Sequence, residues 1–313
     1  MQAMVIEEGR LGWQERPDPR VGDHDLLVAV RAAGVNGADL VQRRGLYPAP
    51  PGWPPDIPGL EMAGEVVSVG PRVSRSAPGE RVMALVGGGA QATLATVDEA
   101  HALAVPAGLP WPEAGGFMEV FATAFDALFG QARLTLGERL LVTGAAGGVG
   151  CAAVQLASLA GAHVVAAVRD RAQHEAVAGL GAAEVIAPAE VAARGPYDVV
   201  LELVGAAVLP AALEGLATTG RVVVIGVGGG ARLEIDLLQL MSRRARLFAS
   251  TLRARSRDEK ATLVAALGAQ ALPLLASGRM RVPVSVTFPL PDAATAYDRF
   301  AGGGKLGKIV LVA

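Results

Sequence analysis

Residues 140–150, LLVTGAAGGVG, decide the fold of this chain. A short apolar run there gives way to small residues and then to an alanine-rich helical pattern. A glycine-rich turn between a strand and a helix brings backbone N–H groups and the positive helix end against a pyrophosphate. The dinucleotide fingerprint is G-x-G-x-x-G after a strand. Gly147 and Gly150 match it, whereas Ala145 stands where the first glycine belongs.

The alanine weakens the motif without removing it, because the first glycine serves the tight turn and alanine is tolerated there while φ stays negative. The patterns at 139–144, 148–161 and 163–168 predict a strand, a helix and a second strand. Together they supply the βαβ unit of about 30 residues that the fingerprint requires. We therefore expect a dinucleotide at this turn. The residues expected to contact it are Ala145, Ala146, Gly147, Gly148 and Val149.

The end of the second strand selects the cofactor. An acidic residue there binds the adenosine ribose, whereas an arginine accepts the 2′-phosphate of NADPH. The sequence VVAAVRDRAQ places Arg169 at this position with Arg171 close by. Two guanidinium groups favour a phosphate through charge-assisted hydrogen bonds, so NADPH is the expected cofactor. The alternative is that both arginines lie on a solvated turn and Asp170 binds the ribose.

Alternating helix and strand patterns, with helices predicted over 113–129 and 171–181, continue to about residue 258, and one more helix is predicted over 259–278. Near-continuous Val, Ile and Leu strands between helices indicate a parallel sheet covered on both faces, so 115–258 is predicted to be a doubly wound α/β domain. The first 110 residues read instead as short strands between turns, with a loop at 47–59 that holds six prolines. We expect the tail to return to this mainly-β domain, giving 1–114 with 259–313. A third small domain is the alternative.

The amino-acid composition limits the kinds of partner and the cellular compartment that we expect for this protein. The 313 residues are 51% hydrophobic, with a net charge of −2 that gives no general attraction to nucleic acid or anionic membranes. The single cysteine, Cys151, excludes an internal disulfide framework, and the N-terminus lacks the basic and apolar regions of a signal peptide. No apolar run reaches the length of a membrane span. We therefore expect a cytoplasmic protein with no nucleic-acid or membrane partner.

Five segments carry a resemblance to a known family. They are AAGVNGADLVQRRGLYP (32–48), PGLEMAGEVVSVG (58–70), VTGAAGGVG (142–150), GRVVVIG (220–226) and GKIVLV (307–312). With these the chain resembles the zinc-independent quinone oxidoreductases of the medium-chain dehydrogenase/reductase superfamily, the branch of zeta-crystallin-like and p53-inducible quinone oxidoreductase-like proteins. The resemblance implies a GroES-like domain with a Rossmann domain, NADPH as hydride donor, a quinone as acceptor and a homodimer. The alternatives are an enoyl-thioester or enone reductase, and a weakly catalytic NADPH-binding sensor or scaffold.

The resemblance also addresses metal binding and catalysis. Zinc-dependent relatives hold their catalytic metal at positions that correspond to Asn36, Leu60 and Glu119, and a leucine cannot ligate zinc. We therefore expect no metal. In the resembling enzymes an asparagine and a loop tyrosine border the nicotinamide and the acceptor, which makes Asn36 and Tyr47 the candidate catalytic residues. The simpler alternative is that Asn36 is a turn residue and Tyr47 anchors its loop.

The resemblance further implies cofactor contacts at Thr123, Gly226, Leu252 and Lys308. Some relatives hold the 2′-phosphate with a lysine and a tyrosine, and this chain offers Gln173 and Ala187-Pro188 instead, so the NADPH prediction depends on the two arginines. The basic run 243–257 is interpreted as strand ends and solvated turns. No proton donor is assigned.

Overall fold

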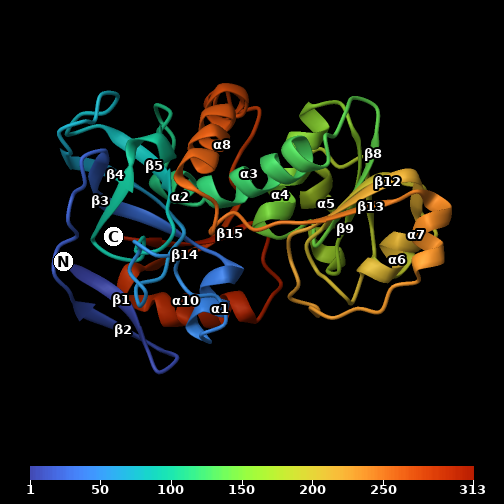
Figure 1. Ribbon diagram of the computed structural model, residues 1–313, viewed down its shortest axis with the longest axis horizontal. Helices are drawn as coiled ribbons and strands as arrows, with labels where there is room; N and C mark the ends of the chain where they lie inside the picture. The colour runs from blue at the N-terminus through green and yellow to red at the C-terminus, as the bar shows by residue number, and fades with distance from the viewer. The chain divides into compact units, whose positions relative to one another are not determined.

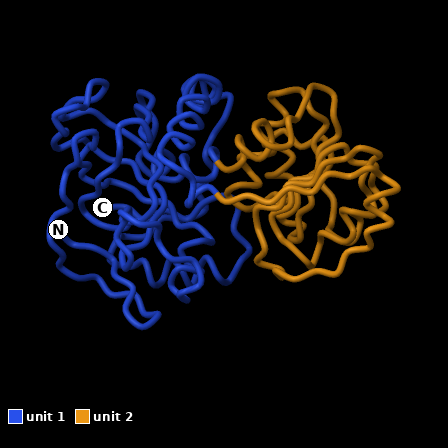
Figure 2. The backbone as a smooth tube through the Cα atoms, viewed as in Figure 1, with its two compact units in different colours: residues 1–122, 252–313 blue, residues 123–251 orange.

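The computed structural model describes all residues, 1–313, and divides them into two compact units (Figure 2). Unit 1 comprises Met1–Ala122 and Leu252–Ala313, and unit 2 comprises Thr123–Thr251. The expected boundaries, after residues 114 and 258, lie several residues away. The segment from Leu252 packs with unit 1 because the guanidinium of Arg253 is bonded to the carbonyl oxygen of Gly87 and to Gln42.

Unit 2 is built on a six-stranded sheet with all neighbouring strands parallel (Figure 1). The strands are β8 (Arg139–Thr143), β9 (His163–Ala167), β10 (Glu184–Ile186), β11 (Tyr197–Glu202), β12 (Leu216–Val224) and β13 (Arg246–Ala249). Their spatial order is β10-β9-β8-β11-β12-β13. This is the Rossmann order, with its switch point between β8 and β11. The predicted α/β class of this region is confirmed.

The helical segments of unit 2 are shorter than the sequence predicted. They are the end of α3 (Met118–Phe125), the π-helical η2 (Asp126–Gln131), α4 (Gly148–Leu159), η3 (Arg171–Gln173), α5 (His174–Ala178), η4 (Pro188–Glu190), α6 (Leu209–Glu214) and α7 (Leu237–Arg243). The helix predicted over 171–181 is a 3₁₀ turn followed by five α-helical residues. No pattern predicted α7, because its Leu237, Leu238 and Met241 are exposed and do not mark a buried face.

Unit 1 contains a seven-stranded sheet in the order β14-β15-β3-β4-β5-β7, with β6 also paired to β3. The strands are β3 (Asp25–Val35), β4 (Glu61–Val69), β5 (Arg81–Leu85), β6 (Leu94–Asp98), β7 (Ala102–Ala104), β14 (Val284–Pro289) and β15 (Lys308–Val312). A separate hairpin pairs β1 (Gln2–Glu7) with β2 (Arg10–Glu15). The tail strand β15 lies antiparallel to β3, in the same sheet as the strands from the first part of the chain.

Two of the helices predicted in unit 1 are each divided in the structure, one at a glycine and one next to a proline. The helices of unit 1 are α1 (Gly37–Arg43), η1 (Glu99–His101), α2 (Trp111–Gly115), the start of α3, α8 (Arg257–Gln270), α9 (Leu272–Ala276), η5 (Leu290–Asp292) and α10 (Ala293–Ala301). The single helix predicted over 113–129 is interrupted at Gly116, which caps α2. The one predicted over 259–278 is divided before Pro273, which lies in the first turn of α9.

None of the helices combines the length and the apolar character needed to cross a bilayer. The cytoplasmic location stays a prediction.

Candidate active site

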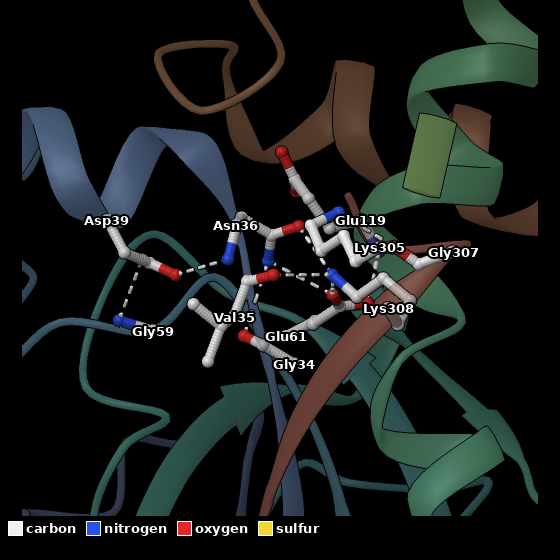
Figure 3. A network of polar contacts seen from close by, with 10 residues as sticks. All are labelled: Gly34, Val35, Asn36, Asp39, Gly59, Glu61, Glu119, Lys305, Gly307 and Lys308. Carbon is white, nitrogen blue, oxygen red and sulfur yellow. Dashed lines mark hydrogen bonds and ion pairs between the residues drawn. The ribbon is translucent and has the colours of Figure 1, made fainter. Parts of the chain in front are cut away.

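A buried ion pair between Glu61 and Lys308 lies at the centre of the site in unit 1 (Figure 3). Glu61 begins β4 and Lys308 begins β15, the two strands that flank the end of β3. The Glu61 side chain passes over Gly34 of β3, where a Cβ would come within 2.2 Å of Glu61 Oε1. Gly34 must therefore be glycine for the carboxylate to reach the ammonium across the strand.

The Lys308 ammonium forms three hydrogen bonds. Nζ donates to Glu61 Oε1 at 2.6 Å, to Asn36 Oδ1 at 2.6 Å and to the carbonyl oxygen of Val35 at 3.0 Å. All three N–H groups are engaged, and the side chain is 2% exposed. Lys308 therefore lies within this network, and its ammonium has no proton left for the cofactor contact that the resemblance implied.

Asn36 is held on both sides of its amide. Nδ2 donates to Glu61 Oε1 at 3.0 Å and to the carbonyl oxygen of Gly34 at 3.3 Å, while Oδ1 accepts from Lys308. Asn36 is also the N-cap of α1, and its backbone N–H donates to Asp39 Oδ2 at 2.8 Å. Burial raises the pKa of Asp39 to about 6. The proposed donation from Asn36 to a substrate stays untested, and it requires Nδ2 to leave a partner shown here.

Glu119, a residue of α3, is bonded to the Glu61 carboxylate through its backbone. Its backbone N–H donates to Glu61 Oε2 at 2.9 Å, so Asn36 and Glu119 contact the two oxygens of Glu61. Burial, followed by the negative charge of Glu61, raises the pKa of Glu119 to about 8. Asn36 and Glu119 were expected from the sequence at metal-equivalent positions, but Glu61 was not predicted, because its only signal was a charge within the apolar run LEMAGEVV.

Tyr47 begins the proline-rich loop and is anchored by Arg253. The guanidinium of Arg253 donates to the carbonyl oxygens of Tyr47 and Gly87 and to Gln42 Oε1, each at 2.8 Å. It also lies 5.1 Å from the centre of the Tyr47 ring. Lys260 Nζ donates to the carbonyl oxygen of Arg253 at 2.7 Å. Arg253 is 3% exposed, so the interpretation of the run 243–257 as solvated turns is wrong at this residue.

The geometry of the glycine-rich turn in unit 2 explains how Ala145 can stand where the fingerprint has its first glycine. Gly144 has φ +58° and makes the left-handed turn, whereas Ala145 has no positive φ. A Cβ on Gly150 would lie 2.6 Å from both the Cα of Ala145 and the carbonyl oxygen of Gly144. The first-turn amides of α4 lack carbonyl partners within the helix, as in any helix, and Gly147 precedes them as N-cap. This tight, small-residue turn at the end of β8 fits a dinucleotide pyrophosphate.

Arg169 and Arg171 follow the carboxyl end of β9, and both are exposed. Between them, Asp170 Oδ1 accepts a hydrogen bond from the backbone N–H of Ala172 at 3.0 Å and caps η3. The carboxylate that would compete for a ribose is therefore engaged in its own turn. The two guanidinium groups face solvent at the position where the sequence expects the 2′-phosphate.

Glu202, at the switch point, is a buried residue that the sequence analysis missed. Its Oε1 accepts hydrogen bonds from Thr143 Oγ1 at 2.9 Å and from the N–H groups of Val204 at 2.6 Å and Gly205 at 2.8 Å. Burial raises its pKa. These bonds tie the end of β8 to the loop after β11 beside the glycine-rich turn.

The remaining predicted contacts belong to different units. Thr123 is buried in α3 and Leu252 is buried at the start of the last segment of unit 1. Gly226 lies after β12, where a Cβ would come within 2.3 Å of the carbonyl oxygen of Leu203. The close packing of Gly226, after β12, against Leu203, after β11, is thus a sufficient reason for a glycine at position 226. The cofactor contact of Gly226 stays a prediction.

The side chains at the metal-equivalent positions do not form a metal-ligand set. Leu60 is 1% exposed and offers no ligating atom, and no group of three or more His, Cys, Asp or Glu side chains is arranged to hold a metal ion. The cation at this site is the Lys308 ammonium, which the fold holds beside Asn36 and Glu61.

These features define a class of oxidoreductases that combine a GroES-like unit with a Rossmann unit. Residues 22–128 match the family described as an alcohol dehydrogenase GroES-like domain, and residues 148–269 match that described as a zinc-binding dehydrogenase. Quinone oxidoreductase of Mus musculus is 31% identical over 305 residues, covering 92% of this chain and 89% of the relative. The chain belongs to the quinone oxidoreductase branch of the medium-chain dehydrogenase/reductase superfamily.

Other similarities extend beyond the quinone oxidoreductases. Phthioceranic/hydroxyphthioceranic acid synthase of Mycobacterium tuberculosis is 33% identical over 302 residues, but the alignment, which covers 93% of this chain, spans only 14% of the synthase. Among solved structures, the Pseudomonas syringae quinone oxidoreductase has a TM-score of 0.89 at 27% identity, and a mycobacterial protein complexed with NADPH has a TM-score of 0.89 at 26% identity. Both alignments cover 100% of each chain.

Proposed function

We propose that this protein is an NADPH-dependent, metal-free reductase that transfers hydride to a quinone or a similar conjugated carbonyl. The observation that carries the proposal is the network around Lys308. The Lys308 ammonium and the Glu61 carboxylate are bonded to the Asn36 amide and the Glu119 backbone, at two of the positions where zinc-dependent relatives bind their metal, and Leu60 removes one necessary ligand. Similarity to the mouse quinone oxidoreductase over nearly its full length supports the acceptor class.

The residues proposed to bind the cofactor and those proposed to orient the acceptor lie in different units. Bound NADPH supplies the hydride. In unit 2 the small residues 145–149 bind its pyrophosphate, and Arg169 and Arg171 bind the 2′-phosphate. In unit 1 Asn36 and Tyr47 orient the acceptor, and Lys308 holds the Asn36 amide in place.

The function is tested by NADPH oxidation with 1,4-benzoquinone, 9,10-phenanthrenequinone and crotonyl-CoA in parallel. We expect turnover with one or both quinones that exceeds turnover with the thioester. Faster reduction of crotonyl-CoA would instead support the enoyl-thioester alternative, which the 33% identity to the mycobacterial acid synthase favours. Tight NADPH binding without turnover on any acceptor would support the sensor or scaffold alternative and contradict the proposal.

The cofactor preference depends on Arg169 and Arg171. Replacing both with alanine removes the charge-assisted hydrogen bonds to the 2′-phosphate, so we expect NADPH binding to weaken by about 1–3 kcal/mol while NADH binding stays nearly unchanged. Fluorescence titration gives the dissociation constants of NADPH and of NADH for the wild type and the variant. An equal loss for the two cofactors would show that these arginines do not select the phosphate, and Arg194→Ala, an exposed arginine of the same unit, is the matched control.

We also propose that two copies associate through the β13 edge of unit 2. β13 is the last strand of its sheet, so one row of its backbone hydrogen-bonding groups is open to another strand. Exposed apolar side chains lie on β13 and on α7, the helix that precedes it in the chain. They are Leu237, Leu238, Met241 and Leu247, with exposures of 69%, 73%, 70% and 43%. An apolar patch next to an open sheet edge fits a twofold interface between identical chains.

A further inference from the structure

Glu202 is a fully buried acid at the carboxyl end of β11, one of the two strands that flank the switch point of unit 2. Its Oε1 accepts three hydrogen bonds, from Thr143 Oγ1 at 2.9 Å and from the N–H groups of Val204 at 2.6 Å and Gly205 at 2.8 Å. Its other oxygen, Oε2, is buried and has no hydrogen-bond partner. A buried polar atom without a partner costs free energy, which points to Oε1 and its three donors as the role of this side chain.

Thr143 connects Glu202 to the glycine-rich turn. Its hydroxyl donates to Glu202 Oε1 and accepts a hydrogen bond from the backbone N–H of Leu203 at 2.8 Å, so the end of β8 and the loop after β11 are joined in both directions. Thr143 directly precedes Gly144, the residue with φ +58° that begins the turn. A Cβ on Gly144 would lie 3.3 Å from a methyl group of Val204, so the turn lies closely against that loop. The start of the turn is therefore held by Glu202 through one hydroxyl.

The backbone of Glu202 contacts a third loop at this edge of the sheet. Its carbonyl oxygen accepts hydrogen bonds from the N–H groups of Ile225 at 2.9 Å and Gly226 at 3.2 Å, which follow β12. The loops after β11 and β12 are joined again where the N–H of Gly229 donates to the carbonyl oxygen of Val204 at 2.6 Å. Ligands of doubly wound sheets bind outside the carboxyl ends of the strands, at the switch point. Glu202 thus joins the loops after β8, β11 and β12 at the edge where ligands of this fold bind.

We propose that Glu202 is a positioning residue for the dinucleotide, and that it holds the glycine-rich turn in the conformation that presents its backbone N–H groups to the pyrophosphate. The proposal rests on the reductase function above, in which residues 145–149 bind the pyrophosphate. Backbone donors point where the path of the chain directs them, so a turn of this kind must be held in place by its surroundings. Glu202 is fully buried, so it acts through Thr143 rather than by touching the cofactor.

The test compares the binding of NADPH, NADH and 2′-AMP to the wild type and to Glu202→Met by isothermal titration calorimetry. Methionine has a similar size but no carboxyl oxygen, so the hydroxyl of Thr143 and two N–H groups lose their acceptor. We expect the Kd values of NADPH and NADH to rise alike, each by about tenfold, because both ligands contain the pyrophosphate. The Kd of 2′-AMP, which lacks the pyrophosphate and is expected at Arg169 and Arg171, should stay unchanged. Glu202→Gln keeps an oxygen for the same donors and should retain most of the dinucleotide affinity.

A second pair of variants changes the same link from the side of β8, and it tests the proposal even if Glu202→Met does not fold. Thr143→Val removes the hydroxyl but keeps the shape, whereas Thr143→Ser retains a hydroxyl. We expect Thr143→Val to weaken both dinucleotides and Thr143→Ser to retain most of the affinity. Glu202→Met combined with Thr143→Val should lose little more than either change alone, because both break one link. Glu214→Met, at an exposed acid of α6, is the matched control and should bind all three ligands as the wild type does.

The pattern across the three ligands decides the outcome. Unchanged dinucleotide binding in both Glu202→Met and Thr143→Val would overturn the proposal, because the turn would then not depend on this link. An equal loss of 2′-AMP affinity would also overturn it, since the whole unit and not the turn would be disturbed. A wild-type protein that binds neither dinucleotide contradicts the reductase function, and the positioning role with it. Tighter binding of NADH than of NADPH contradicts only the cofactor assignment, because the loss expected in Glu202→Met is the same for both.

Discussion

Lys308 and Glu61 show how a single buried charge depends on its partners. Both side chains are almost completely removed from solvent, and transferring either ion alone from water is costly. The ammonium is compensated by a carboxylate, an amide oxygen and a backbone carbonyl. The buried ion pair is thus stable only while all three of these oxygens contact the ammonium. Its bonds also fix the position of Asn36 and of the start of α3.

Removing the ammonium tests this dependence. We expect Lys308→Met to lower the free energy of unfolding by about 3–5 kcal/mol, because Glu61 is left as a buried unpaired charge. Glu61→Gln in the same chain should restore much of that loss, since it removes the orphaned charge. Urea unfolding measures both variants. Lys305→Met, which changes a partly exposed lysine nearby, should cost much less, and equal losses for the two lysines would contradict the role given to the ion pair.

The sequence indicated which residue types meet at the site but not how they are bonded. Asn36, Glu119 and Lys308 were all named from the resemblance, yet the pairing of Lys308 with Glu61 depends on strand register across β3. That register joins residues more than 200 positions apart and leaves no local pattern. Arg253 escaped notice for a related reason: an arginine in an arginine-rich run looks solvated until its burial is known.

The proline-rich loop is an element without regular structure that depends on a residue far along the chain. Its prolines remove backbone donors, so few hydrogen bonds within the loop can order it. Arg253 supplies external bonds to Tyr47, to Gln42 of α1 and to Gly87 after β5. The position of Tyr47 is therefore set by the segment before α8. Local sequence rules predicted this loop but not its anchor.

Arg253→Met should loosen the loop. Three hydrogen bonds and the contact with the Tyr47 ring are lost, and buried acceptors are left unsatisfied, so we expect a loss of about 2–5 kcal/mol in unfolding free energy. Hydrogen exchange at residues 47–58 should accelerate more than elsewhere in unit 1. Arg20→Met, a change at an exposed arginine, should leave exchange in this segment unchanged. Uniform acceleration across unit 1 would contradict a local anchor.

At the scale of the whole molecule, the two units differ in how they are assembled. Unit 2 is one continuous segment, whereas unit 1 combines the beginning of the chain with its last 62 residues, Leu252–Ala313. The sequence predicted this insertion from the change of periodicity near residue 113. The exact boundaries depend on tertiary contacts such as those of Arg253, which no periodicity reports.

Association of two copies is expected to depend on α7. Leu238→Glu combined with Met241→Glu places charges within the exposed apolar patch, so we expect the dimer to dissociate into monomers. Sedimentation velocity distinguishes the two states. Leu136→Glu alters another exposed leucine of unit 2, at 82% exposure, and should leave the mass unchanged. A wild-type protein that sediments as a monomer would contradict the interface.

The insertion also sets an order of events during synthesis. Every strand of the parallel sheet emerges from the ribosome before β15, so unit 2 can fold while the chain is still growing. Unit 1 must wait for its tail, because β3 lacks its neighbour and Glu61 lacks its cation until Lys308 appears. Unit 1 therefore completes its sheet only after β15 has been synthesised, and pulsed hydrogen exchange during refolding should protect β8 and β11 before β3 and β4.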